Sequence, residues 1–95
     1  MYYVYIIKNF ANKLYVGVTR NPNDRVNYHN HKRGAKFTKR IPTFKIVFLE
    51  QYPTLTEARK REIQIKKWRR DKKEVLIERY KKGLPTKMRR QGRNA

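Results

Sequence analysis

Two short stretches of alternating β-branched and aromatic residues open the chain and predict a β-hairpin. They cover residues 2–8 and 14–18, and the segment between them, from Asn9 to Asn12, is rich in turn-forming types. Such side chains suit the pleated surface of a sheet, and asparagine favours the connecting turn. Directly paired residues share a face of a sheet. An odd number of residues between the last paired positions would therefore put Tyr5 and Tyr15 on one face.

A third apolar stretch, residues 43–50, has few polar interruptions and predicts a strand that is covered on both sides. We expect it to pair with the hairpin, because a two-stranded hairpin alone is only marginally stable in water. Strict alternation would place Phe44, Ile46 and Phe48 on one face of this strand and Val47 and Leu49 on the other.

Helix signals follow the hairpin and the third strand. The first predicted helix begins at Pro22, after Asn21 as N-cap, and extends to about residue 32. The second begins with a capping box from Thr54 to Glu57 and extends to about residue 70. The third covers residues 72–82, with Asp71 as N-cap and Glu74 in a capping box, and ends at Gly83. Its inward-facing residues are Leu76, Ile77 and Tyr80.

A carboxylate interrupts the apolar stripe of the second predicted helix. Leu55, Ala58 and Ile65 follow helical spacing, and Glu62 occupies the position between the last two. A charge in a buried stripe costs stability unless a partner compensates it. Glu62 is thus either half of a salt bridge or a functional carboxylate, as a metal ligand or a catalytic group. We expect it at the edge of a cleft, facing the Tyr5 side of the hairpin.

The charge of the chain points to a polyanionic partner. With 95 residues and 26 lysines and arginines against seven acids, the formal net charge is +19, and self-repulsion at that charge opposes compaction. Nucleic acid is the first candidate partner and an anionic membrane surface the second. No apolar run is long enough to span a bilayer, and cysteine is absent. We expect a cytoplasmic monomer with one domain over residues 1–83 and a basic, disordered tail over residues 84–95.

The predicted loop after the first helix interleaves cations with an aromatic ring, Phe37. Such a loop suits a phosphate backbone with a base stacked nearby, although charged runs are more often simply solvated. The nucleic-acid-binding candidates in it are Lys32, Arg33, Lys36, Lys39 and Arg40.

These residues together resemble the GIY-YIG nuclease family. The two strand motifs of that family correspond here to Tyr3-Val4-Tyr5 and Tyr15-Val16-Gly17, the helix arginine to Arg25, and the helix glutamate to Glu62. His29, one turn after Arg25, matches a histidine seen in family members. The chain departs from the family at positions 3 and 4, where tyrosine and valine replace glycine and isoleucine. It looks most like the small stand-alone bacterial members.

The resemblance implies a GIY-YIG endonuclease fold, of the α+β type within the broad α/β class. This fold is a three-stranded antiparallel sheet flanked by helices, in the order β-β-α-β-α-α. It also implies a catalytic set. Tyr5 would act on the attacking water with help from Tyr15, Arg25 would clamp the phosphate, His29 would orient a group or shuttle a proton, and Glu62 would hold one Mg²⁺ ion.

Two functions from different classes remain open. The first is a metal-dependent endonuclease that acts on DNA, in repair or recombination. The second is a non-catalytic DNA- or RNA-binding module that keeps the fold, since small size and strong basicity suit both. No protein partner is indicated, and a membrane-surface role is disfavoured because charges lie on several helix faces.

Overall fold

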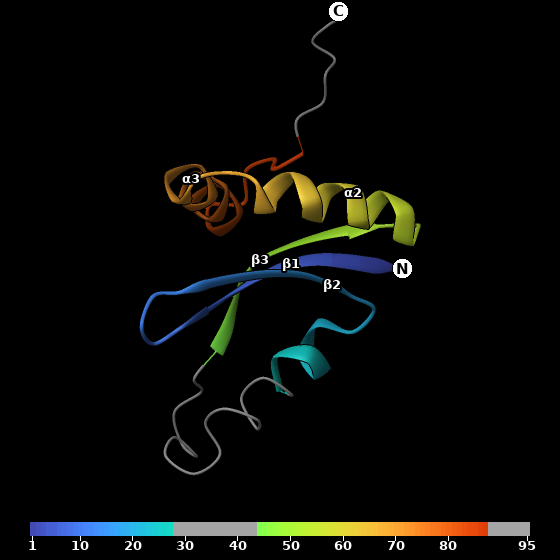
Figure 1. Cartoon of the computed structure of the whole chain (residues 1–95), viewed down its shortest axis with the longest axis horizontal. Helices are drawn as coiled ribbons and strands as arrows, with labels where there is room; N and C mark the ends of the chain where they lie inside the picture. The colour runs from blue at the N-terminus through green and yellow to red at the C-terminus, as the bar shows by residue number, and fades with distance from the viewer. Residues whose placement is uncertain (28–43, 88–95) are drawn as a thin grey trace, which may run out of the picture.

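A three-stranded antiparallel sheet forms the centre of the protein (Figure 1). The computed structural model describes residues 1–27 and 44–87. The strands are β1 (Tyr2–Asn9), β2 (Leu14–Thr19) and β3 (Phe44–Tyr52), and their order in the sheet is β2-β1-β3. The strand β1 lies in the middle and pairs with both neighbours. The predicted fold class, a three-stranded antiparallel sheet flanked by helices, is confirmed.

The hairpin register puts the two candidate tyrosines on one face. Tyr5 pairs with Gly17, Ile7 pairs with Tyr15, and five loop residues separate the last pair, Lys8 and Leu14. Within this loop, Asn9 Oδ1 accepts hydrogen bonds from the Ala11 and Lys13 amides at 3.0 and 2.9 Å. Asn12 adopts a left-handed conformation with φ 66°, which asparagine tolerates better than most residues. The expected odd spacing is confirmed.

Helices cover both faces of the sheet (Figure 1). The helices α2 (Leu55–Lys66) and α3 (Arg70–Lys81) lie on one face, and the helical residues 22–27 lie on the other. Each face has its own core cluster. The α2–α3 face buries Val4, Ile6, Phe48, Ala58, Ile65, Leu76 and Ile77, whereas the opposite face buries Tyr5, Ile7 and Phe44 against the partly buried Tyr15, Val26, Ile46 and Leu49.

A bulge in β3 overturns the expected alternation of that strand. Ile6 pairs with Phe48 while the next residue, Ile7, pairs with Ile46, so β3 has one extra residue at this point. An inserted residue reverses the faces of the residues beyond it. Phe44 and Ile46 consequently lie on the tyrosine face, while Phe48 packs on the α2–α3 face. The predicted faces are therefore wrong for Phe48 and for Leu49, which lies on the tyrosine face.

The start of α2 agrees with the sequence prediction, but the turn to α3 comes earlier than expected. Thr54 Oγ1 accepts a hydrogen bond from the Glu57 amide at 3.2 Å. The helix ends at Lys66 rather than near residue 70, because Arg69 takes an extended conformation (φ −73°, ψ 165°) and becomes the N-cap of α3. The predicted cap roles of Asp71 and Glu74 are therefore wrong. Asp71 lies in the first turn of α3, and Glu74 pairs with Arg70 at 2.7 Å.

Two side chains predicted to face inward from the helices are instead well exposed. Leu55, at the start of α2, is 42% exposed, so the buried stripe of this helix consists of Ala58, Glu62 and Ile65. Tyr80 is 39% exposed, although the edge of its ring contacts Phe48.

The end of α3 leads into a segment that packs back onto the domain. Gly83 has φ 75°, and the Leu84 amide donates to the Arg79 carbonyl at 2.9 Å, which is the expected glycine-terminated end. Lys87 Nζ donates to the Gln51 carbonyl at 2.9 Å and lies 4.2 Å from the centre of the Tyr52 ring. Residues of the predicted tail, Thr86 and Lys87, thus contact the domain. The rest of that tail, residues 88–95, lies outside the described residues.

A buried ion pair joins β3 to α2. Glu50, predicted only to end a strand, is 5% exposed, and its carboxylate accepts two hydrogen bonds from Arg61 at 2.9 and 3.1 Å. Tyr52 donates to the same carboxylate at 2.8 Å. Burial and this hydrogen bond raise the pKa of Tyr52. Arg61 also donates to the Thr86 carbonyl at 2.9 Å, which ties the C-terminal segment to the network.

Within the part of the chain that the structure describes, no helix has the length and apolarity needed to cross a membrane.

Replacing Arg61 by methionine should destabilise the fold by about 3–5 kcal/mol, because Glu50 would remain buried without its cationic partner. Chemical denaturation monitored by circular dichroism measures the change. Lys60→Met removes a neighbouring but exposed cation and should change the free energy of unfolding by no more than about 0.5 kcal/mol. Equal stability of the two variants would show that the Glu50–Arg61 pair is not structurally important.

Candidate functional site

The first candidate residue, Tyr5, is held across the β1–β2 pair by the absence of a side chain at Gly17. Tyr5 is only 6% exposed, and Gly17 is its direct partner on β2. A β-carbon at position 17 would lie 2.6 Å from Tyr5 Cζ and closer still to its hydroxyl oxygen. Real atoms do not approach so closely. The glycine therefore allows the Tyr5 ring to reach over the backbone of β2.

Tyr15 lies on the same face, two residues before Gly17 on β2. It is partly buried, and its ring meets Phe44 edge-on, with 5.5 Å between ring centres and an angle of 70° between planes. Aromatic pairs favour this geometry. Tyr5 and Tyr15 thus form a tyrosine pair that belongs to one core cluster and is fixed by strands β1 and β2.

Arg25 lies on the helical segment that covers the tyrosine face. Asn21 Oδ1 accepts from the Asp24 amide at 3.2 Å, which confirms the predicted N-cap. The neighbouring Val26 packs into the cluster that contains Tyr5, so the segment is anchored on this face, and Arg25 itself is exposed. His29 and the basic candidates Lys32, Arg33, Lys36, Lys39 and Arg40 lie outside the described residues.

Glu62 lies on the opposite side of the sheet from the tyrosine pair. Its flanking stripe residues, Ala58 and Ile65, pack on Val4 and Ile6, whose side chains alternate with Tyr5 along β1. The expectation that Glu62 faces the Tyr5 side is therefore wrong. The expected burial is confirmed, because Glu62 is only 6% exposed.

Both carboxylate oxygens of Glu62 take part in ion pairs. Arg59 Nη1 lies 3.2 Å from one oxygen, and Lys66 Nζ lies 3.0 Å from the other. These partners are three residues before and four residues after Glu62, a spacing that places them on the same helix face. That spacing is visible in the sequence, so the pairing could have been predicted. The two cationic side chains are 57% and 54% exposed.

Helix geometry places Glu62 toward the edge of the sheet formed by β2. Ala58 and Ile65 are about two turns apart and mark the line of contact with the sheet, so Arg61 and Glu62 lie on either side of that line. Arg61 reaches Glu50 on β3, and hence Glu62 lies on the side of α2 nearer β2. Because β2 is an outer strand, the tyrosine pair and Glu62 reach the same edge from opposite faces.

A divalent ion would find one carboxylate at this edge. Among residues 1–27 and 44–87, no group of three or more histidine, aspartate or glutamate side chains could hold a metal. Mg²⁺ keeps several water ligands and is often bound by one or two carboxylates together with substrate phosphate. Glu62 fits that donor chemistry, and an ion bound there would compete with the half-exposed Lys66 for its carboxylate.

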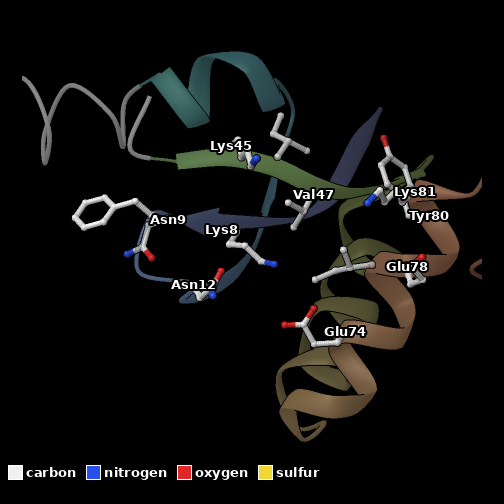
Figure 2. Close-up of a pocket in the computed structure, with 12 residues that line it drawn as sticks. Lys8, Asn9, Asn12, Lys45, Val47, Glu74, Glu78, Tyr80 and Lys81 are labelled. Atoms are coloured by element: carbon white, nitrogen blue, oxygen red, sulfur yellow. The ribbon is translucent and has the colours of Figure 1, made fainter. Parts of the chain in front are cut away.

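A groove of about 650 Å³ lies away from the candidate residues, between the hairpin loop, β3 and α3 (Figure 2). Lys8, Asn9 and Asn12 approach from the hairpin, while Glu74 and Glu78 approach from α3. Lys45 and Lys81 also line the groove, so three lysines face two glutamates and the charge of the lining is mixed. The groove contains none of the candidate catalytic residues.

Comparison with known proteins identifies the family of the chain. Residues 1–75 match the family model described as the GIY-YIG catalytic domain. UPF0213 proteins of Staphylococcus aureus strains Mu3 and N315 are 43% identical to this chain over 76 residues, which is 80% of this chain and 93% of the relative. The solution NMR structure of a UPF0213 protein from Bacillus halodurans is 33% identical, with a TM-score of 0.55, and the match covers 82% of this chain and 84% of that one. On this evidence the chain belongs to the GIY-YIG catalytic domain family.

Proposed function

We propose that the protein is a Mg²⁺-dependent endonuclease that hydrolyses phosphodiester bonds in DNA, with a role in repair or recombination. Membership of a nuclease-type family gives the reaction class. The observation that carries the proposal is the packing of Tyr5 over Gly17, with Tyr15 on the same face. A sheet that only had to be stable would not require a glycine at this position, whereas a tyrosine held in a fixed orientation would.

The residues divide the work of hydrolysis as follows. Tyr5, assisted by Tyr15, orients the attacking water and accepts its proton. Arg25 presents a planar fork to the scissile phosphate and stabilises the charge that develops there. His29 orients or transfers a proton. Glu62 holds the divalent ion, which when bound supplies charge neutralisation at the phosphate.

The ion pairs of Glu62 favour testing a second function, a nucleic-acid-binding module without catalysis. Both oxygens of Glu62 are already paired with Arg59 and Lys66, as in a purely structural carboxylate. A nucleic-acid-binding module without catalysis would keep this arrangement permanently. In a nuclease, the exposed Lys66 would have to leave when the divalent ion binds.

The substitution Glu62→Gln separates the two functions. We expect it to abolish Mg²⁺-dependent cleavage of linear, nicked and branched DNA. The stability should change by no more than about 1 kcal/mol, because both ion-pair partners are half exposed. Glu78→Gln makes the same chemical change at an exposed carboxylate of α3, which pairs with Lys82 at 3.6 Å, and should leave cleavage intact. Undiminished cleavage by the Glu62 variant would remove this residue from the active site.

Replacing Arg25 by lysine tests the phosphate clamp. Lysine keeps the charge but lacks the two-pronged donor geometry of arginine, so most of the cleavage activity should be lost while the fold survives. Cleavage rates at saturating DNA and thermal melting measure the two effects. Arg20→Lys, at an exposed arginine just before the same helical segment, is the control and should retain activity. Equal rates in both variants would place the clamp elsewhere.

Replacing Gly17 by alanine tests the positioning of Tyr5. The added methyl group would collide with the Tyr5 ring and displace it, and a displacement of about 1 Å can cost about a hundredfold in rate. The NMR signals of the Tyr5 ring should shift in parallel with the loss of cleavage. Tyr5→Phe removes only the hydroxyl group and shows how much activity depends on it. Full activity in the alanine variant would contradict the proposed role of the Tyr5–Gly17 packing.

A further inference from the structure

The turn between α2 and α3 has the highest density of positive charge among the described residues. Eight consecutive residues, 66–73, include six cations and one acid, Asp71. We call this segment the elbow. Its cations are Lys66, Lys67, Arg69, Arg70, Lys72 and Lys73. Like charges three or four residues apart on a helix repel one another, so the fold alone does not account for so many cations in this segment.

The acids near the elbow neutralise only part of its charge. Lys66 pairs with Glu62 at 3.0 Å, and Arg70 pairs with Glu74 at 2.7 Å. Arg69 lies 3.9 Å from Asp71, but the two side chains are 88% and 78% exposed, so solvent screens this contact. Lys67 is also exposed. The elbow thus presents an excess of positive charge to solvent.

The elbow is held in place by a tryptophan at its centre. Trp68 packs against the core cluster of the α2–α3 face, and its amide donates to the Ile65 carbonyl at 3.0 Å. Arg61 lies 5.4 Å and Lys72 lies 4.4 Å from the centre of the ring. These contacts fix the backbone of the turn, and the exposed Lys67 and Arg69 flank the tryptophan in sequence and line one shallow hollow with it. A fixed array of cations loses less entropy on binding than a flexible one.

We propose that the elbow, which contains none of the residues assigned to catalysis, is a binding surface for a nucleic-acid backbone. It would contact phosphates through Lys67 and Arg69 and carry no sequence preference. Lys66, the first elbow residue, is also an ion-pair partner of Glu62. The two residues are four positions apart on α2, which corresponds to about 6 Å along the helix axis. A strand lying on the elbow would therefore continue toward the β2 edge.

This inference relies on the proposed function, because it takes the polyanion to be a nucleic acid. The groove of Figure 2 is lined by three lysines and two glutamates, so it lacks the excess of positive charge found at the elbow. An anionic membrane would also be attracted by the charge. However, Trp68 is partly buried against the core and does not project as an apolar anchor, which favours a nucleic-acid backbone over a lipid surface.

The test compares two double variants that remove the same amount of charge. Lys67→Gln with Arg69→Gln alters the elbow, and Lys60→Gln with Lys81→Gln alters exposed cations on α2 and α3 outside it. Binding to labelled duplex DNA and duplex RNA, each of about 20 base pairs, is measured in EDTA between about 50 and 200 mM salt. Matching circular dichroism spectra and melting temperatures establish that all proteins are folded.

The elbow variant should show a weaker dependence of affinity on salt. Each lost phosphate contact lowers the slope of log K against log salt by about 0.9, so two contacts lower it by about 1.8. Over that salt range the wild-type affinity would then fall about 12-fold more than that of the elbow variant. The control variant should keep the wild-type slope. A reduced slope with DNA only, or with RNA only, identifies which backbone the elbow binds.

Three other results would contradict either the elbow proposal or the proposed function. Equal slopes for the two double variants would overturn the elbow while leaving the proposed function intact. Wild-type binding that does not depend on salt for either duplex would instead overturn the proposed function. Elbow-dependent binding to phosphatidylserine vesicles, with no elbow-dependent binding to either duplex, would assign the surface to lipid and overturn the proposal.

Discussion

The structure depends on one strand, β1, being covered on both faces. Its even-numbered residues Val4 and Ile6 pack against α2 and α3, while its odd-numbered residues Tyr5 and Ile7 form the core of the other face. All four are at most 6% exposed. Because a shift by one residue would exchange the two faces, the register of the sheet is strongly specified. The same alternation that specifies the fold places a tyrosine, rather than an aliphatic residue, beneath the helical residues 22–27.

On the α2–α3 face of the sheet, two adjacent residues of α2 have different roles. Arg61 turns toward β3 and forms the buried pair with Glu50, whereas Glu62 turns toward the β2 side. The Glu50–Arg61 pair has two parallel hydrogen bonds and a third from Tyr52, which is the geometry that a buried charge needs. Since helix residues have fixed angular offsets, fixing Arg61 also fixes Glu62. The carboxylate with a structural role thus orients the carboxylate proposed for catalysis.

Much of the fold and part of the site could be predicted from the sequence, because those features depend on local patterns. The hairpin, the shared face of Tyr5 and Tyr15, the N-caps at Asn21 and Thr54 and the burial of Glu62 follow from periodicity and capping chemistry. The bulge in β3 could not be predicted, since it depends on how β3 pairs with a strand more than thirty residues earlier in the chain. The face on which α2 packs is likewise a non-local choice, and it decided the side of the sheet on which Glu62 lies.

The role of Glu50 shows why charge in a sequence is hard to interpret without the fold. Glu50 and Glu62 are both buried carboxylates paired with arginine, yet their partners differ in one physical respect. The Arg61 side chain is 10% exposed, and if it moved away it would leave the buried charge of Glu50 without a partner. Arg59 and Lys66 are more than half exposed, so each can move into solvent and leave Glu62 free for another cation. Exchangeable partners permit a carboxylate to bind a divalent ion, and a buried partner does not. Of the two, Glu62 is therefore the one suited to a metal, and this distinction rests on the exposure of the cations rather than of the acids.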